Sequence, residues 1–118
     1  MLQCQLRAAE LGYITSLPVS EVVYDILVDT NKKILKTQVK YCNRKKISEN
    51  YLELRLSNPQ SKRFFYLDTQ IDMLLVFIPQ KNTVLKYDPQ IFHRRRTLQI
   101  NLINKKSKWF YERYIWKG

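Results

Sequence analysis

An acid, an amide and an amine stand close together in residues 24–40, YDILVDTNKKILKTQVK. The acid is Asp25, and the amide and the amine are Gln38 and Lys40. The stretch reads as two strands joined by a polar turn, and folding it about residues 31–32 places Asp25 opposite Gln38. Strand side chains alternate between faces, so Gln38 and Lys40 project to the side that holds Asp25. A carboxylate that binds a divalent cation beside a lysine that orients water is the minimum apparatus for metal-assisted phosphodiester hydrolysis.

The opposite face of this predicted hairpin is apolar, as a core-facing surface must be. It collects Ile26, Val28, Leu35, Thr37 and Val39. Taken singly, each polar residue of the other face fits an ordinary solvated strand position; their combination indicates chemistry. Mg²⁺ takes hard oxygen ligands and usually keeps several waters, so a site with few protein ligands suits it.

Composition limits the class of protein and of partner. A chain of 118 residues with 45% hydrophobic residues makes one domain with a real core, and we assign residues 1–118 to it. The 21 Lys and Arg exceed the 10 Asp and Glu, which gives a net charge of +11. This excess predicts a polyanionic partner, either nucleic acid or an anionic membrane surface, and nucleic acid is favoured.

The cysteines and the hydropathy pattern predict a setting without disulfides or membrane. Cys4 and Cys42 are far apart, and with one histidine in the chain a zinc site is not expected. We expect two free thiols in a reducing compartment. The sequence has neither an apolar run of membrane-spanning length nor a signal peptide, so the cytoplasm is the expected location.

Periodicity and turn residues predict an α+β domain. It has an N-terminal helix, a mostly antiparallel curved mixed sheet of six or seven strands, and a C-terminal helix. The first helix ends at Gly12, and Ser107 caps the last. The expected helices span residues 2–11 and 108–116, and the strands outside the hairpin span 13–16, 51–56, 64–66, 71–78, 83–87 and 97–103.

Two basic runs and two alternating strands are candidates for contact with nucleic acid. Basic side chains would bind phosphates and give a steep salt dependence. Outward polar residues on the strands could read base edges, because a β-ribbon fits the major groove. The basic candidates are Arg44, Lys45 and Lys46, then Arg94, Arg95 and Arg96; the strand candidates are Glu53, Arg55, Gln99 and Asn101.

Asp25, a hairpin and then Gln38-Val39-Lys40 resemble the signature of PD-(D/E)XK nucleases in its Asp…(Glu/Gln)-x-Lys form. A wider frame is similar to the PD-(D/E)XK homing endonucleases encoded in group I introns. That frame consists of Gly12-Tyr13, Pro18, residues 24–28, residues 38–40, Ile71-Asp72 opening an apolar strand that ends in Ile78-Pro79, and Trp109 with Tyr114. The resemblance covers nearly the whole chain.

This resemblance implies a restriction-endonuclease-like core and Mg²⁺-dependent cleavage of double-stranded DNA at a specific site by a homo-oligomer, a dimer or a tetramer. It makes Asp25 a metal ligand and puts Gln38 in the place of the second acid, where its amide oxygen serves. Val39 would lend its backbone carbonyl to the same cation. Lys40 would position the attacking water and stabilise charge on the phosphate. An organellar location follows if the host intron is organellar.

Two other functions stay open. Members of this family commonly carry a glutamate on the first helix, at the place that Met1 takes here. A catalytically inactive relative that only binds DNA, with sequence specificity, is therefore an alternative. An intron-associated accessory protein that binds RNA is a third. The C-terminal aromatic residues are expected in the core or at an oligomer interface.

Overall fold

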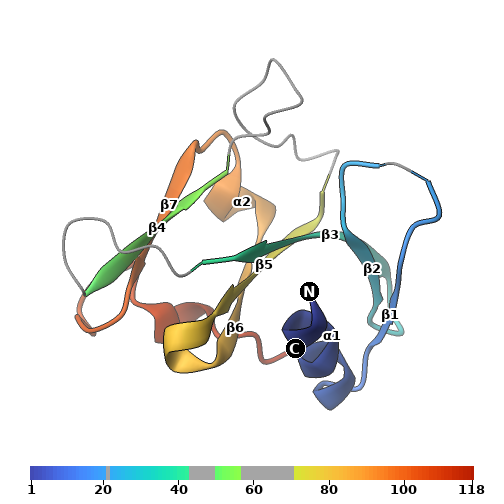
Figure 1. Cartoon of the computed structure of the whole chain (residues 1–118), viewed down its shortest axis with the longest axis horizontal. Coiled ribbons are helices and arrows are strands. Elements are labelled where there is room, and N and C mark those ends of the chain that lie inside the picture. Colours follow the sequence, from blue (N-terminus) through green and yellow to red (C-terminus); the bar gives the residue numbers. More distant parts are fainter. Residues whose placement is uncertain (21, 43–49, 57–70) are drawn as a thin grey trace.

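The computed structural model describes residues 1–20, 22–42, 50–56 and 71–118. In these ranges, strands β1, β2, β3, β5 and β6 form one sheet in that order, and β4 pairs with β7 in a separate ribbon (Figure 1). The strands are β1 (Ile14–Ser16), β2 (Ile26–Asp29), β3 (Ile34–Tyr41), β4 (Tyr51–Arg55), β5 (Met73–Ile78), β6 (Thr83–Tyr87) and β7 (Thr97–Asn101). The helices are α1 (Leu2–Glu10) and α2 (Pro89–Phe92), with 3₁₀ turns at Pro79–Lys81 and Tyr111–Tyr114.

The N-terminal helix ends as its sequence predicts. Gly12 has a φ of +81°, a left-handed conformation that glycine adopts without steric cost. Its N–H donates to the carbonyl of Ala9 at 3.0 Å, and the N–H of Tyr13 donates to the carbonyl of Ala8 at 2.9 Å. These bonds satisfy carbonyls that the end of the helix would leave without donors, and they direct the chain into β1.

The five-stranded sheet is mixed, because β3 and β5 run parallel while the neighbouring pairs run antiparallel. All six residues of β5 are buried, as the continuous apolar run predicts. Asp72, just before β5, fixes the parallel register: its N–H donates to the carbonyl of Lys36 at 2.7 Å, and its Oδ2 accepts the Lys36 N–H at 2.9 Å. Gln38 therefore lies beside Leu74.

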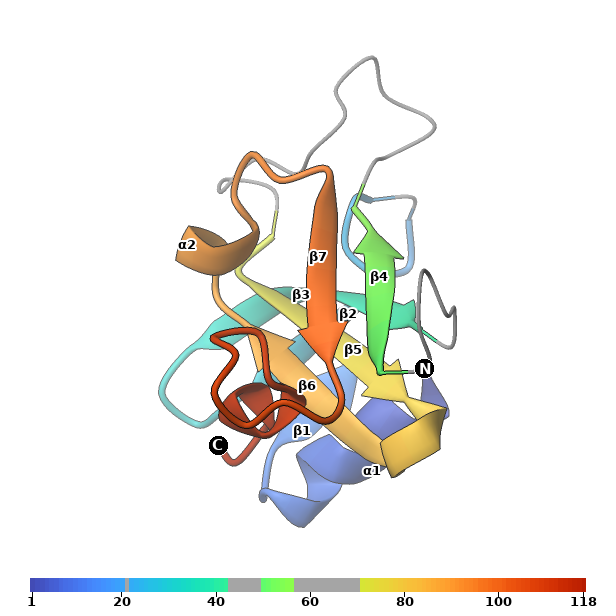
Figure 2. The ribbon, with the colours of Figure 1, turned by 90° about the vertical axis from the view of Figure 1, so that its left-hand side faces the viewer.

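The sheet is covered on both faces (Figures 1 and 2). One face packs on α1, and the other packs on the β4–β7 ribbon. The first core cluster includes Cys4, Ala8, Ile26, Val28, Met73, Leu75, Phe77, Val84 and Trp116. The second includes Leu52, Leu54, Leu98 and Ile100 of the ribbon against Leu74, Val76, Ile78, Leu85 and Tyr87 of the sheet.

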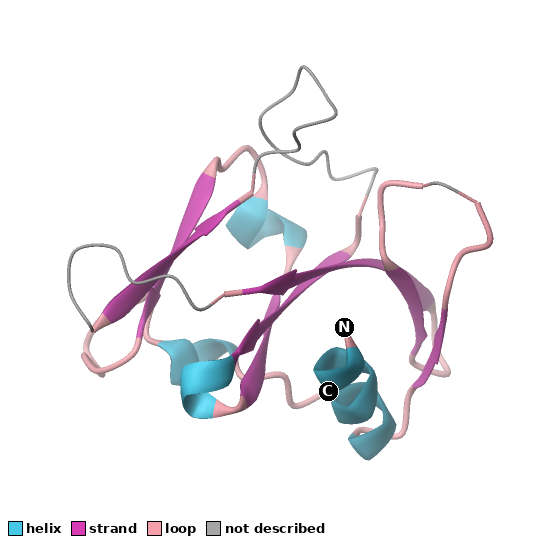
Figure 3. Cartoon of the chain, viewed as in Figure 1, coloured by secondary structure: helices cyan, strands magenta, loops and turns pink. Residues whose placement is uncertain are grey.

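The predicted C-terminal helix over residues 108–116 is wrong. Only Tyr111–Tyr114 are helical, as a short 3₁₀ turn, and the chain after them is extended (Figure 3). The physical reason is that Ile115 pairs with Leu85 and the Trp116 N–H donates to the carbonyl of Val84, which covers the edge of β6. The segment thereby packs Tyr114 on one core cluster and Trp116 in the other, which one face of a helix could not do.

Both cysteines are buried, and no disulfide involves them in the described residues. Burial raises the pKa of the Cys4 thiol to about 11. The Cys42 thiol donates to the carbonyl of Glu53 at 3.8 Å. The strand expected over residues 64–66 lies outside the described part of the chain. No helix among the described residues is long and apolar enough to cross a membrane.

Candidate active site

The β2–β3 hairpin has the register that the sequence predicts. Ile26 lies opposite Thr37, and the same register places Asp25 opposite Gln38. The turn holds this register because Asn31 adopts a φ of 72°, a conformation that asparagine tolerates better than most residues. The Asp25 N–H also donates to the carbonyl of Thr37 at 2.9 Å, which ties Asp25 to β3.

The Asp25 carboxylate is held over β3 by a backbone donor. Its Oδ2 accepts the N–H of Val39 at 2.8 Å. Val39 is the residue between Gln38 and Lys40, so this bond fixes the acid beside both. The resemblance implies a role for Val39 through its carbonyl, whereas the structure shows a contact through its N–H. Side chain to backbone bonds of this kind leave no pattern in the sequence.

Gln38 carries a buried oxygen that lacks a hydrogen bond. Its side-chain Oε1 has no donor in the part of the chain that the structure describes. Most buried polar atoms are hydrogen-bonded, and one that is not costs free energy unless a ligand satisfies it. Gln38 lies between Asp25, the residue before β2, and Leu74 on β5. The unsatisfied oxygen thus belongs to the same face of the sheet as the Asp25 carboxylate.

Lys40 follows Gln38 on this face. It is half-buried and lies beside Val76 of β5, whose side chain belongs to the core cluster under the ribbon. The alternation of β3 thus sends Gln38 and Lys40 to the ribbon side, while Val39 packs on the cluster under α1. All three predicted catalytic residues come together.

The donor atoms of this site fit a hard cation. A carboxylate oxygen of Asp25 and the unsatisfied amide oxygen of Gln38 are both ligand types that Mg²⁺ prefers. Among the described residues, no three His, Cys, Asp or Glu side chains form a cluster that could hold a metal ion. The site therefore suits a cation that keeps much of its hydration shell rather than one enclosed by protein.

The β4–β7 ribbon brings together most of the predicted base-reading positions. Glu53 lies opposite Gln99 and Arg55 opposite Thr97. Arg55 and Gln99 are exposed, and Glu53 is half-exposed, on the side of the ribbon away from the core. Asn101 differs, because its Oδ1 accepts the N–H groups of residues 103 and 104 at 3.0 and 2.6 Å and so shapes the turn after β7.

The basic run before β7 lies at the same end of the ribbon as Arg55. Arg94, with a φ of 58°, and Arg95 and Arg96 are all exposed. The guanidinium of Arg95 lies 4.7 Å from the centre of the Trp109 ring, and the Arg96 carbonyl accepts a backbone N–H from the residue after β4 at 2.8 Å. The other predicted run, Arg44, Lys45 and Lys46, lies outside the described residues.

The C-terminal aromatic residues pack within the chain. Tyr114 stacks on Tyr87 with ring centres 4.7 Å apart and on Trp109 at 6.4 Å, while Phe110 and Trp116 are buried. Burial raises the pKa of Tyr87 and, partly offset by nearby arginines, that of Tyr114. These rings therefore pack in the core, which is one of the two positions that the sequence predicts for them.

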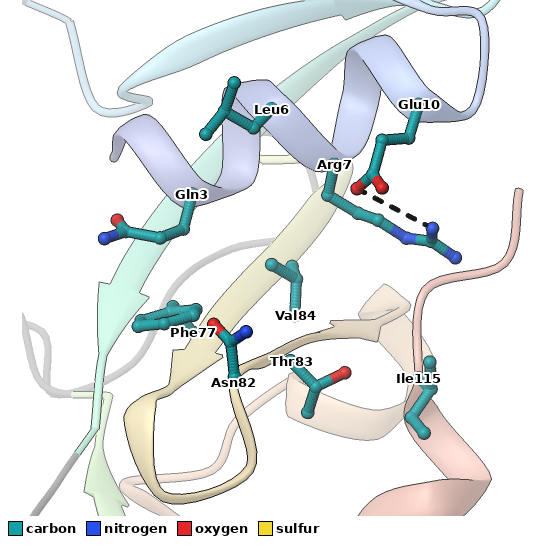
Figure 4. A pocket seen from close by; sticks show the side chains of 9 residues that line it. All are labelled: Gln3, Leu6, Arg7, Glu10, Phe77, Asn82, Thr83, Val84 and Ile115. Atoms are coloured by element: carbon teal, nitrogen blue, oxygen red, sulfur yellow. Dashed lines mark ion pairs between the residues drawn. The ribbon is translucent and has the colours of Figure 1, made fainter.

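A groove of about 430 Å³ lies between α1 and the β5–β6 hairpin (Figure 4). Its wall includes Arg7, which pairs with Glu10 at 3.9 Å and donates two hydrogen bonds to the carbonyl of Trp116. It is on the α1 side of the sheet, whereas Gln38 and Lys40 face the ribbon side. This groove is not part of the candidate site.

Comparison with solved structures identifies the fold. The chain is similar to a bacterial homing endonuclease, I-Ssp6803I, with a TM-score of 0.73 and 17% identity over 97% of this chain and 82% of that one. It is also similar to Hjc, a Holliday junction resolvase of Archaeoglobus fulgidus, with a TM-score of 0.56 and 16% identity over 86% of this chain and 87% of that one. The predicted restriction-endonuclease-like fold is thereby confirmed.

Two further comparisons were negative. No protein-family model matches the sequence, and no curated protein matches it.

We predict that the Asp25 side chain contributes to stability as a hydrogen-bond acceptor. Asp25→Ala removes the acceptor for the Val39 N–H and should lower the free energy of unfolding by about 1–2 kcal/mol. Asp25→Asn keeps an oxygen at that position and should cost less than about 1 kcal/mol. Urea denaturation of the two variants measures both changes. An equal loss in both would mean that the charge, not the hydrogen bond, matters.

Proposed function

We propose that this chain is an Mg²⁺-dependent endonuclease that cleaves both strands of DNA at a specific site, of the homing type encoded in group I introns. The observation that carries the proposal is one row of polar groups across the sheet. The Asp25 carboxylate is bound to the Val39 N–H at 2.8 Å, beside the unsatisfied buried oxygen of Gln38, with Lys40 next on the same face. The fold shared with a homing endonuclease and a Holliday junction resolvase supports it.

Each residue of the row has one task. The Asp25 carboxylate holds the cation and supplies the negative charge of the site, while Gln38 adds a neutral oxygen and Val39 its backbone carbonyl. When bound, the cation supplies a Lewis acid that polarises the phosphodiester and activates water. The ammonium of Lys40 orients the attacking water and stabilises negative charge that develops on the phosphate.

The ribbon is the proposed DNA-binding surface. The run of arginines that adjoins it is basic, and the ribbon lies on the side of the sheet to which Gln38 and Lys40 project. Arg55 and Gln99 would reach base edges, and Arg94 and Arg96 would bind phosphates.

The first test of the function is cleavage by the Asp25→Asn variant. Because this variant keeps the bond to Val39 but loses the charge that holds the cation, we expect cleavage to fall roughly 100-fold or more with the fold intact. The substrate is a supercoiled plasmid incubated with MgCl₂. It carries the sequence that flanks, on both sides, the intron in which the gene for this chain would lie. Equal cleavage by wild type and variant would refute the site. Tight DNA binding without cleavage by the wild type would identify an inactive relative.

A second test changes the charge of the cation site. Gln38→Glu places a second carboxylate opposite Asp25, so the MgCl₂ concentration for half-maximal cleavage should fall about tenfold. Gln38→Leu, which lacks the oxygen, should raise it. A magnesium titration of cleavage measures both, with calorimetry as an independent measure of cation binding. The same magnesium dependence in all three proteins would show that Gln38 is not a ligand.

A third test concerns the ribbon. Arg94→Ala, in the run of arginines that adjoins the ribbon, should reduce the slope of log Kobs against log salt concentration by about 1, because one phosphate contact is lost. The control is Lys117→Ala, which removes an exposed charge near α1, on the other side of the sheet from the ribbon. Fluorescence anisotropy of a labelled duplex over a series of NaCl concentrations gives both slopes. An unchanged slope for Arg94→Ala, or the same change in both variants, would rule out this surface.

A further inference from the structure

The chain carries a second group of basic residues after β7. Residues 94–113 contain seven of the 21 Lys and Arg of the sequence, and Glu112 is the only acid among them. Three of the seven form the run of arginines before β7. The other four follow β7 and are Lys105, Lys106, Lys108 and Arg113. We call residues 104–108 the lysine loop, and it belongs neither to the candidate site nor to the β4–β7 ribbon.

The backbone of the lysine loop is held by side chains from the segment that follows it. Arg113 donates from Nε to the carbonyl of Ser107 at 3.0 Å and from Nη2 to the carbonyl of Lys105 at 3.1 Å. The hydroxyl of Tyr114 donates to the carbonyl of Lys108 at 2.8 Å. These bonds restrain the loop in one conformation, which lowers the entropy cost of ordering it around a ligand.

The ammonium groups of the loop lack an acidic partner. Lys105, Lys106 and Lys108 are exposed, and no carboxylate among the described residues forms an ion pair with any of them. Arg113 adds a fourth positive charge beside them. Like charges held close together repel each other, and an anion bound between them relieves this repulsion. The loop therefore suits a negatively charged ligand.

Trp109 connects the lysine loop to the run of arginines before β7. The Nζ of Lys108 lies 4.9 Å from the centre of its indole ring, and the guanidinium of Arg95 lies 4.7 Å from the same centre. The loop also lies beside β7, because the Asn101 N–H donates to the carbonyl of Trp109 at 2.9 Å. This contact is on the edge of β7 away from β4 (Figure 2). The two basic segments thus meet at one edge of the ribbon.

The apolar residues near the loop favour nucleic acid over a membrane as its ligand. Binding to a membrane surface takes several exposed apolar or aromatic side chains beside the basic ones. The ring of Trp109 is instead half-buried against Tyr114, Arg95 and Lys108. From β7 to the last residue, Ile103 is the only exposed large apolar side chain. Cations spread over two segments match a polyanion whose phosphates repeat along its length.

We propose that the lysine loop binds phosphates of the DNA duplex that the ribbon contacts, at the edge of β7 away from β4. The inference rests on the proposed function for its partner and adds Lys105, Lys106 and Lys108 to the residues that hold it. A lysine binds a phosphate as a point charge and reads no base. The loop therefore strengthens binding to every sequence equally, and discrimination between sequences is left to the ribbon.

The salt dependence of DNA binding without metal tests this proposal. The double variant Lys105→Ala/Lys106→Ala should reduce the slope of log Kobs against log salt concentration by about 2, because two phosphate contacts are lost. The matched control is Lys32→Ala/Lys33→Ala, which removes two adjacent exposed lysines from the β2–β3 turn, at the other end of the molecule from the ribbon (Figure 1). Both variants lose the same net charge. Fluorescence anisotropy of a labelled duplex gives the slopes, and circular dichroism verifies that both variants fold.

Each outcome decides the proposal. A slope reduced in the loop variant alone, and by the same amount on a duplex of unrelated sequence, supports it. An unchanged slope, or equal reductions in the loop variant and its control, overturns it. Phosphatidylserine vesicles that bind the wild type and not the loop variant, with the DNA slope unchanged, would assign the loop to a membrane and also overturn it.

The result is separable from the tests of the proposed function. The measurement needs neither magnesium nor cleavage, so an inactive protein that binds DNA would still show the effect of the loop. If Arg94→Ala lowers the slope and the loop variant does not, the lysine loop is refuted while the proposed DNA-binding ribbon stands.

Discussion

The structure depends on the alternation of side chains along β3. This strand pairs antiparallel with β2 and parallel with β5, so it lies inside the sheet and has covered neighbours on both sides. Its odd-numbered residues, such as Val39, pack toward α1, and its even-numbered residues, Gln38 and Lys40, face the ribbon. A register shift of one residue would exchange the two sets and bury the polar groups. One constraint thus sets both the core and the proposed catalytic row.

The carboxylate of Asp25 shows how backbone structure can prepare a site for a ligand. Its bond to the Val39 N–H restrains the side chain before any cation arrives. The Gln38 oxygen, buried and without a donor among the described residues, has an unsatisfied hydrogen-bonding capacity that a cation or its water would satisfy. A site with one charge suits a weakly held, hydrated ion, and the surrounding basic surface would hold the DNA more than the metal does.

Charge is distributed along this chain in two parts. The run before β7 is basic, whereas residues 8–31, which include β1 and β2, carry only acidic charges. A polyanion is attracted to the first part and not to the second. The Asp25 site lies between them, because β2 joins the β1 edge to the centre of the sheet.

The sequence alone determined the features that arise from local periodicity and turn chemistry. It predicted the hairpin register, the face shared by Asp25, Gln38 and Lys40, the end of α1 at Gly12 and the buried strand β5. Only the tertiary structure decided that residues 108–116 form turns and a short 3₁₀ helix followed by an extended segment, because covering the β6 edge outweighs their helical pattern. It also decided that the Val39 N–H binds Asp25 and that Arg95 lies against Trp109, since contacts between distant segments have no local signature.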